Sequence, residues 1–353
     1  MSKPIICIIY TGGTIGMKRL QDGVLRPPEN PDDFLRIAPD LHKFIDFDLV
    51  KLMNKDSTNI NHHDWTKISK TIYDRRNKGY DGFVVAHGTD TMHFSASAVA
   101  FALGKNLNFP VVFTGAQTIP EIHHGDARIN LIRACKVATT NIAEVVISFG
   151  EFVFRGCRAQ KKDERRFDAF HSPAYYPLAY ITEEIIIHQT AFLKENSNKG
   201  MDINLKSNFE DGIAQISLIP GLEPELLKPI IESKLCKGVI LQSFGAGNVP
   251  HEEPYNFEGI IKESKKYHKP ILITSQFPAN ATLHTSYEPG RAAVLAGAIP
   301  TGNMTSACAV VKFRWVLSRV NNQILQKQIK ESQRIENVKK MMEKVYVGEM
   351  DKP

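Results

Sequence analysis

Short apolar runs alternate with segments whose apolar residues recur at helical spacing through most of the chain. Continuous apolar runs predict buried strands, and apolar residues at every third or fourth position predict helices that cover them. Trp65, Ile68 and Ile72, for example, would share one face of a helix that begins near Asp64. The strands predicted in the first part of the chain are residues 5–10, 47–53, 82–86, 110–113 and 144–149. Because strands that alternate with helices form parallel sheets with right-handed crossovers, the pattern predicts an α/β fold.

The periodic pattern is interrupted at residues 193–211, where Lys, Asn, Ser, Gly and Asp predominate. It resumes with strands predicted at 214–218, 238–242 and 270–274 and helices near 224–234, 256–267, 289–297 and 303–319. After residue 320 the chain is rich in Lys, Gln and Glu, yet apolar residues still recur at helical spacing. A chain of 353 residues is too long for one ordinary core. We therefore predict a domain at 1–192, a linker at 193–211, a smaller α/β domain at 212–325 and a helical tail at 326–353.

Composition and charge narrow the class of protein. With 42% hydrophobic and 23% charged residues, the chain falls in the ordinary globular range. Its five cysteines are far apart and include no Cys-x-x-Cys pair, which argues against a disulfide framework or a structural zinc site. The sequence shows no secretory signal and no apolar stretch long enough to span a membrane, so a cytoplasmic location is expected. The net charge of +6 comes from basic residues interleaved with acids, so neither nucleic acid nor membrane is an expected partner.

Hydroxyl groups and a carboxylate follow three of the predicted strands. Thr-Gly-Gly-Thr-Ile-Gly at 11–16 follows the first strand, Asp-Ser-Thr-Asn at 56–59 the second, and His-Gly-Thr-Asp at 87–90 the third. The carboxyl ends of parallel strands meet at one edge of a sheet, where ligands bind in open α/β folds. The glycines of the first turn would hold its two threonines, Thr11 and Thr14, in an accessible position. The turns therefore predict a ligand site at this edge of the sheet.

The residues alone leave the chemistry of this site open. A threonine acts as a nucleophile only with a base, such as a lysine whose pKa is lowered. A glycine-rich turn after a first strand can equally bind phosphate or serve as a structural turn, although this sequence has neither Gly-x-Gly-x-x-Gly nor a Walker lysine. The paired histidines at 62–63 and 123–124 have no carboxylate or cysteine cluster at ligand spacing. Loop histidines are the favoured interpretation, and neither a metal nor a cofactor is predicted.

Two motifs make the chain similar to a known family. Tyr-Thr-Gly-Gly-Thr-Ile-Gly at 10–16 and His-Gly-Thr-Asp-Thr-Met at 87–92 closely resemble the two signatures of the L-asparaginase family, its bacterial cytoplasmic type I in particular. Further similar segments extend the resemblance over residues 4–320. The resemblance implies a larger flavodoxin-like amino-terminal domain with a mainly parallel sheet and a smaller Rossmann-like carboxyl-terminal domain. It also implies hydrolysis of L-asparagine to L-aspartate and ammonia by a homodimer or homotetramer.

The resemblance also implies roles for individual residues. Thr14 corresponds to the nucleophile that attacks the side-chain amide and forms an acyl-enzyme. Thr89, Asp90 and Lys161 correspond to a second catalytic triad, and Lys161 is preferred to Lys162 because it fits the family's spacing to the neighbouring motifs. The other implied residues are Ser57, Thr58, Gly88, Asp90 and Ala116 for substrate binding, the main-chain amides of Gly13 and Thr89 for an oxyanion hole, and Asn248 for a neighbouring subunit's site.

The chain departs from the family's pattern at three places. Val24 stands where a tyrosine on a long loop usually assists the nucleophile, and Ala159 and Gln160 replace two threonines before the lysine. Phe277 stands where some type I enzymes have an asparagine-sensing cysteine site, so allosteric activation is not expected.

Two other interpretations stay open. One is the amidase subunit of a tRNA-dependent amidotransferase, although its additional amino-terminal β-domain is not expected because the first motif starts at Thr11. The other is a protein that binds asparagine or aspartate without turnover.

Overall fold

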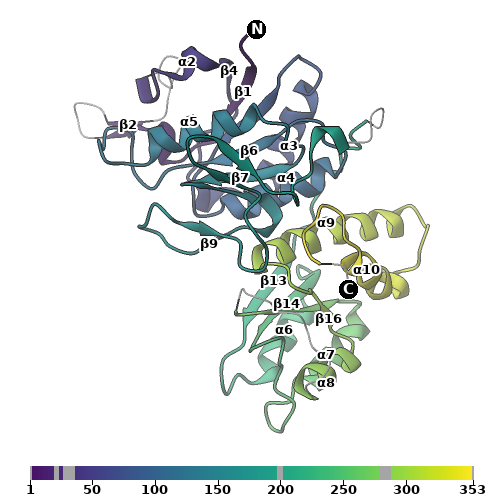
Figure 1. The fold of residues 1–353 in the computed structure, drawn as a ribbon. Helices are drawn as coiled ribbons and strands as arrows, with labels where there is room; N and C mark the ends of the chain where they lie inside the picture. The colour runs from purple at the N-terminus through teal and green to yellow at the C-terminus, as the bar shows by residue number, and fades with distance from the viewer. Residues whose placement is uncertain (1, 20–23, 27–35, 197–201, 278–287, 352–353) are drawn as a thin grey trace. The chain divides into compact units, whose positions relative to one another are not determined.

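The computed structural model describes residues 2–19, 24–26, 36–196, 202–277 and 288–351. It divides into two compact units, Met1–Ser207 and Asn208–Pro353 (Figure 1). The division falls inside the segment 193–211, which the sequence predicted as a linker. The first unit contains a large, mostly parallel sheet and the second a smaller parallel sheet, each with helices, so the predicted α/β fold is confirmed.

The first unit is built on an eight-stranded sheet with the order β12-β11-β8-β7-β6-β5-β1-β4. Its strands are β1 (Ile5–Tyr10), β4 (Asp46–Lys51), β5 (Gly82–Ala86), β6 (Val111–Thr114), β7 (Val145–Phe149), β8 (Phe152–Arg155), β11 (Ala179–Ile181) and β12 (Ile185–Ile187). The strands from β4 to β7 pair in parallel, whereas β8, β11 and β12 add an antiparallel edge. This edge was not predicted. Only Gly150, with a φ of 59°, and Glu151 join β7 to β8, and so short a connection can make only an antiparallel pair.

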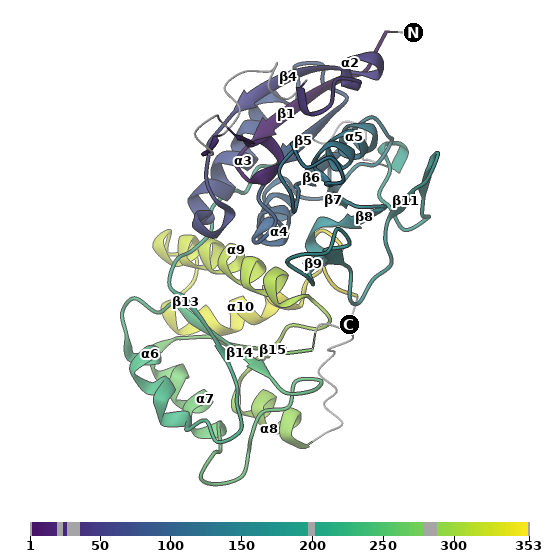
Figure 2. The same cartoon turned by 90° about the vertical axis from the view of Figure 1, so that its left-hand side faces the viewer.

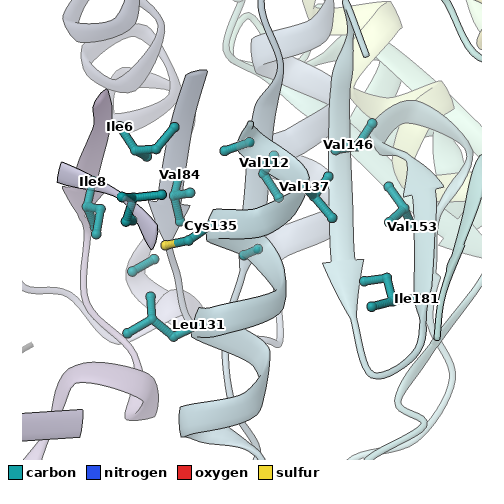
Figure 3. Close-up of a cluster of buried hydrophobic side chains, with 14 of the residues drawn as sticks. Ile6, Ile8, Val84, Val112, Leu131, Cys135, Val137, Val146, Val153 and Ile181 are labelled. Atoms are coloured by element: carbon teal, nitrogen blue, oxygen red, sulfur yellow. The ribbon is translucent and has the colours of Figure 1, made fainter. Parts of the chain in front are cut away.

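The parallel strands β1, β5, β6 and β7 are buried on both faces, which explains their continuous apolar sequences, whereas the edge strand β4 is only partly buried. On one face, Ile6 and Ile8 of β1 belong to the same apolar cluster as Leu131 and Cys135 of α5 (Ala127–Ala138) (Figure 3). Helix α4 (Met92–Leu103) packs against β6 and β7, and α3 (His62–Arg75) packs against α4 (Figure 2). Besides 3-10 turns, the other described elements of this unit are α2 (Leu41–Phe44) and two antiparallel ribbons, β2 (Lys18–Arg19) with β3 (Leu25–Arg26) and β9 (Gln160–Lys161) with β10 (Phe170–His171).

The strand order brings the predicted turns together. In the sheet, β4 lies on one side of β1, and β5 with the later strands lies on the other side. The strand order therefore reverses between β1 and β5. Ligands bind at such a reversal in open α/β sheets. The main-chain pairing also continues past the strand ends, because Thr11 N–H donates to the Ala86 carbonyl at 3.0 Å and His87 N–H to the Thr114 carbonyl at 2.9 Å. The turns after β1, β5 and β6 are therefore tied to one another.

The second unit has a four-stranded parallel sheet with the order β13-β14-β15-β16. Its strands are β13 (Ile213–Ser217), β14 (Gly238–Ser243), β15 (Ile271–Ser275) and β16 (Ile299–Pro300), and its helices are α6 (Lys228–Glu232), α7 (Glu258–Ser264), α8 (Glu288–Ala296), α9 (Ser306–Leu325) and α10 (Arg334–Glu343). The single helix expected at 224–234 is a 3-10 turn, Pro224–Leu227, followed by the short α6. Among the described residues, no helix combines the length and apolar character that a membrane crossing requires.

Candidate active site

The Thr-Gly-Gly-Thr turn after β1 is held against its neighbours by main-chain contacts. Gly12 and Gly13 have φ values of 125° and 87°, which residues with a Cβ rarely adopt. A methyl group on Gly13 would lie 2.5 Å from the Gly88 nitrogen, and one on Gly12 would lie 2.0 Å from the Lys55 carbonyl oxygen. Only glycine permits these approaches. The turn after β1 is therefore in direct contact with the turns after β5 and β4.

The two threonines of this turn have different environments. Thr14 begins the 3-10 turn Thr14–Gly16 and is partly exposed. Thr11 was expected to be accessible too, but only 1% of it is exposed. Its hydroxyl donates to the Ala86 carbonyl oxygen at 2.9 Å. The expectation is wrong for Thr11, which fastens the turn of β1 to β5, so Thr14 supplies the hydroxyl that a ligand could reach.

Asp56 organises the hydroxyl-rich turn after β4. Its Oδ1 accepts from the Thr58 N–H at 2.9 Å and from the Thr58 hydroxyl at 2.7 Å, and these bonds lower the pKa of Asp56. Ser57, which begins the 3-10 turn Ser57–Asn59, is 3% exposed. A methyl group on Gly88 would lie 2.7 Å from the Ser57 hydroxyl oxygen. Ser57 thus faces the turn after β5, whereas the Thr58 hydroxyl is engaged by Asp56.

Thr89, Asp90 and Lys161 form one connected group. Lys161 lies 72 residues after Thr89 in the chain, on the ribbon strand β9. Its Nζ donates to the Thr89 hydroxyl oxygen at 2.8 Å and to Asp90 Oδ1 at 2.7 Å. The Lys161 side chain is 12% exposed and the Asp90 side chain 54% exposed. A largely buried ammonium group therefore connects a hydroxyl to a carboxylate that solvent or a ligand can reach.

Two buried histidines beside this group are neutral. His87 Nδ1 lies 2.7 Å from the Gly88 carbonyl oxygen, so it must donate, and Nε2 then accepts from the Ser95 hydroxyl at 2.9 Å. Burial lowers the pKa of His87 to about 4. Burial, with a smaller contribution from the charge of Lys161, also lowers the pKa of His93 to about 4. The expected structural role of His87 agrees with this geometry, because its ring ties the turn after β5 to α4.

A polar group that the sequence did not single out lies at the end of β6. Gln117 Oε1 accepts from the Thr89 hydroxyl at 3.1 Å. The Gln117 main-chain N–H donates to both carboxylate oxygens of buried Asp126, at 3.1 and 3.0 Å. Asn130 joins Asp126 to the Gly115 carbonyl through its amide group. The sequence could have pointed to Gln117 by its position, because it lies in the turn after the strand that neighbours β5 in the sheet.

The remaining predicted residues lie in three places. Gly88 and Ala116 are buried in the turns after β5 and β6. Val24, at the position of the missing tyrosine, is 51% exposed, and residues 20–23 and 27–35 of its loop lie outside the described residues. Asn248 belongs to the second unit, where its main chain pairs with that of Phe244 through bonds of 2.8 and 3.1 Å. The role of Asn248 between subunits stays a prediction.

Comparison with known proteins gives matches over both units. The chain matches the family model for the asparaginase N-terminal domain at residues 5–193 and that for the glutaminase/asparaginase C-terminal domain at residues 213–330. It is 29% identical over 347 residues to an L-asparaginase of Thermococcus kodakarensis, covering 98% of each chain. A solved structure of the thermostable L-asparaginase from that organism superposes with a TM-score of 0.87 at 27% identity, covering 98% of this chain and 99% of the other. The chain is also 30% identical over 329 residues to a glutamyl-tRNA(Gln) amidotransferase subunit of Methanosphaera stadtmanae, covering 91% of this chain and 73% of that protein.

Proposed function

We propose that this chain, which belongs to the asparaginase family of hydrolases, hydrolyses the side-chain amide of L-asparagine to give L-aspartate and ammonia. The observation that carries the proposal is the double contact of the Lys161 ammonium group with the Thr89 hydroxyl and the Asp90 carboxylate. Thr89 and Asp90 lie on the turn that contacts the turn bearing Thr14. A hydroxyl, a lysine and a carboxylate at one strand edge are the groups that nucleophilic cleavage of an amide requires.

In the proposed reaction, the Thr14 hydroxyl oxygen forms a bond to the carbonyl carbon of the substrate amide. The C–N bond then breaks, and the nitrogen leaves as ammonia with the proton that Thr14 gave up. Water hydrolyses the resulting ester to L-aspartate and restores the hydroxyl. The main-chain N–H groups of Gly13 and Thr89 would stabilise the charge on the carbonyl oxygen. Thr89, held by Lys161, would relay the proton during one of these steps.

Substrate recognition is proposed to rest on opposite charges and a tight turn. The exposed carboxylate of Asp90 suits the α-ammonium group, because it still offers acceptor sites after bonding to Lys161. Ser57 and Thr58, with the main chain at Gly88 and Ala116, would hold the α-carboxylate and the amide. We also propose that the chain works as a homodimer or homotetramer in which Asn248 reaches a neighbouring site.

The similarity to the glutamyl-tRNA(Gln) amidotransferase subunit supports a second candidate. In that case the same threonines would release ammonia for use by a partner protein. A steady-state comparison of L-asparagine with L-glutamine, with and without a tRNA-bound acceptor and partner, separates the two functions. Preference for L-asparagine with no dependence on a partner favours the asparaginase. Tight binding of L-asparagine without ammonia release at any pH would instead indicate a binding protein.

The proposed roles are tested by ammonia release from L-asparagine by purified variants. Thr14→Ala and Lys161→Ala should each lower kcat by at least about a thousandfold, as removal of a nucleophile or its activating group does. Lys162→Ala is the matched control, because Lys162 pairs with Asp168 at 2.6 Å instead. It should keep kcat within about threefold, since exposed pairs contribute little. Near-normal turnover by either of the first two variants would contradict the assignment.

A further inference from the structure

We infer that Gln117 is a positioning residue that fixes the direction of the Thr89 O–H bond and couples it to the loop after Lys161. This inference rests on the proposed function for its kinetic consequence. Gln117 Oε1 accepts from the Thr89 hydroxyl at 3.1 Å, while its Nε2 donates to the main-chain carbonyls of Asp163 and Arg166 at 3.2 and 3.3 Å. One amide group therefore connects the hydroxyl to the loop.

The amide of Gln117 can occupy this place in only one orientation. If it were turned over, its oxygen would face two carbonyl oxygens, and its NH2 group would replace the acceptor of the Thr89 hydroxyl. The carbonyls of Asp163 and Arg166 therefore require that the Gln117 amide oxygen lies on the side of Thr89. Because that oxygen can only accept, the hydrogen of the Thr89 hydroxyl points to Gln117.

The direction of this hydrogen determines what Thr89 offers to Lys161. With its hydrogen directed at Gln117, the Thr89 oxygen presents a lone pair to the Lys161 ammonium group, which donates to it at 2.8 Å. To give its proton to any other acceptor, the hydroxyl has to rotate away from Gln117. Gln117 therefore holds the resting arrangement from which proton transfer starts, and it does so without contacting Lys161 in any of the described bonds.

Gln117 is itself held on a rigid support. Its main-chain N–H contacts Asp126, which is 4% exposed. Asn130, 1% exposed, donates to Asp126 at 3.1 Å and accepts from the Gly150 N–H at 3.2 Å. Buried, fully engaged partners of this kind limit the movement of the residue they hold. The side chain of Gln117 can consequently keep both of its contacts at once.

The same amide group restrains an exposed loop. Asp163 accepts from the N–H groups of Arg165 and Arg166 at 2.7 and 2.9 Å, which forms a tight turn. The side chains of Glu164 and Arg165 are 74% and 89% exposed. The carbonyls of Asp163 and Arg166 are joined to the strand-end turn through Gln117. Loss of these two bonds should let the loop open locally.

The kinetic test replaces Gln117 by an apolar side chain of similar length. Gln117→Met should lower kcat for ammonia release by about tenfold or more while KM changes by less than about threefold, because positioning acts on the reacting state. Gln328→Met is the matched control. The Gln328 amide donates to Gln326 Oε1 at 3.0 Å, and no described bond joins it to Thr89 or Asp126, so both constants should stay within about twofold. An equal decrease of kcat in the two variants, or an increase of KM with no change in kcat, would overturn the positioning role.

A second test does not depend on turnover and compares trypsin cleavage after Arg165 and Arg166. Gln117→Met, which removes two bonds to the loop, should speed this cleavage by about tenfold or more. Thr89→Val, which removes one bond to Gln117, should speed it by between about twofold and tenfold. The double variant should be cleaved no faster than Gln117→Met alone, because both changes break the same connection. If the two accelerations multiply, or if Thr89→Val has none, the coupling is refuted even when the enzyme releases ammonia. If no ammonia is released but the coupling is found, only the proposed function fails.

Discussion

A fully buried ion pair, Lys312 with Glu349, offers the sharpest test of what holds the second unit together. Both side chains are 0% exposed, and the Lys312 Nζ lies 2.7 Å from Glu349 Oε1. Lys312 also donates to the carbonyls of Met342 and Lys344, each at 2.8 Å. Glu349 accepts from the Tyr346 and Val347 N–H groups. Lys312 of α9 therefore holds the segment that runs from the end of α10 to Glu349.

The magnitude follows from removing one charge of this pair. An uncompensated buried charge costs about 3–5 kcal/mol. A domain of about 150 residues loses about 2–4 °C of melting temperature per kcal/mol. Lys312→Met or Glu349→Gln should therefore lower the melting temperature of the second unit by about 10 °C. The double variant should lose less than the sum of the two, because it leaves no buried charge unpaired.

Tryptophan fluorescence can report the unfolding of the second unit alone. The chain has two tryptophans, Trp65 and Trp315, and Trp315 packs against Tyr346 with ring centroids 4.8 Å apart. In a Trp65→Phe background, thermal unfolding followed by fluorescence reports the segment that Lys312 holds. Lys340→Met is the control, because its pair with Glu336 is 67% and 63% exposed, and it should shift the transition by about 2 °C or less. If Lys312→Met and Glu349→Gln also shifted the transition by only about 2 °C or less, the buried pair would not stabilise this segment as argued.

Two further predictions concern the first unit. Burial holds the pKa of His93 at about 4. The unfolded ring titrates near 6.5, so the folded chain binds fewer protons between these values and loses about 3 kcal/mol as the pH falls through them. In His93→Leu, the urea midpoint of unfolding should fall less between pH 7 and pH 5 than in the unaltered protein. His123→Ala, which removes an exposed histidine, should leave this fall as it is. An unchanged fall in His93→Leu would contradict the assigned pKa. Gly13→Ala should lower kcat by about a hundredfold, because a methyl would lie 2.5 Å from the Gly88 nitrogen. Gly79→Ala, with a φ of 83° but open space, should leave kcat unchanged, and equal activity of the two glycine variants would refute the contact argument.

The parallel core of the fold could be predicted because burial on both faces leaves a continuous apolar run. The segments 5–10 and 82–86 coincide with β1 and β5 for this reason. The antiparallel edge was missed because its strands are only three or four residues long, and β11 and β12 are only partly buried. Ile186 on β12 is 58% exposed, so no pattern of burial marked it.

The candidate site could be predicted in part. Thr14, Ser57 and Thr89 were found because each lies in the turn that follows a strand, and the parallel pairing of β4, β1 and β5 brings those strand ends together. Lys161 could not be chosen by spacing, since it lies 72 residues from the hydroxyl it contacts, and only the resemblance pointed to it. Gln117 escaped notice because the direction of a side chain in a turn depends on tertiary contacts that periodicity does not carry.

The glycines explain why the turns of the candidate site lie so close together. Methyl groups on Gly13, Gly88 and Gly115 would each lie within 2.7 Å of an atom in a neighbouring turn. Their absence lets the turns after β1, β4, β5 and β6 approach one another closely, which brings together the three turns that carry Thr14, Ser57 and Thr89. Since the strands beneath are buried and paired, the positions of these hydroxyls are set by the sheet and not by flexible loops. A substitution at a hydroxyl should therefore remove one chemical group, whereas a substitution at one of these glycines should displace all the groups at once.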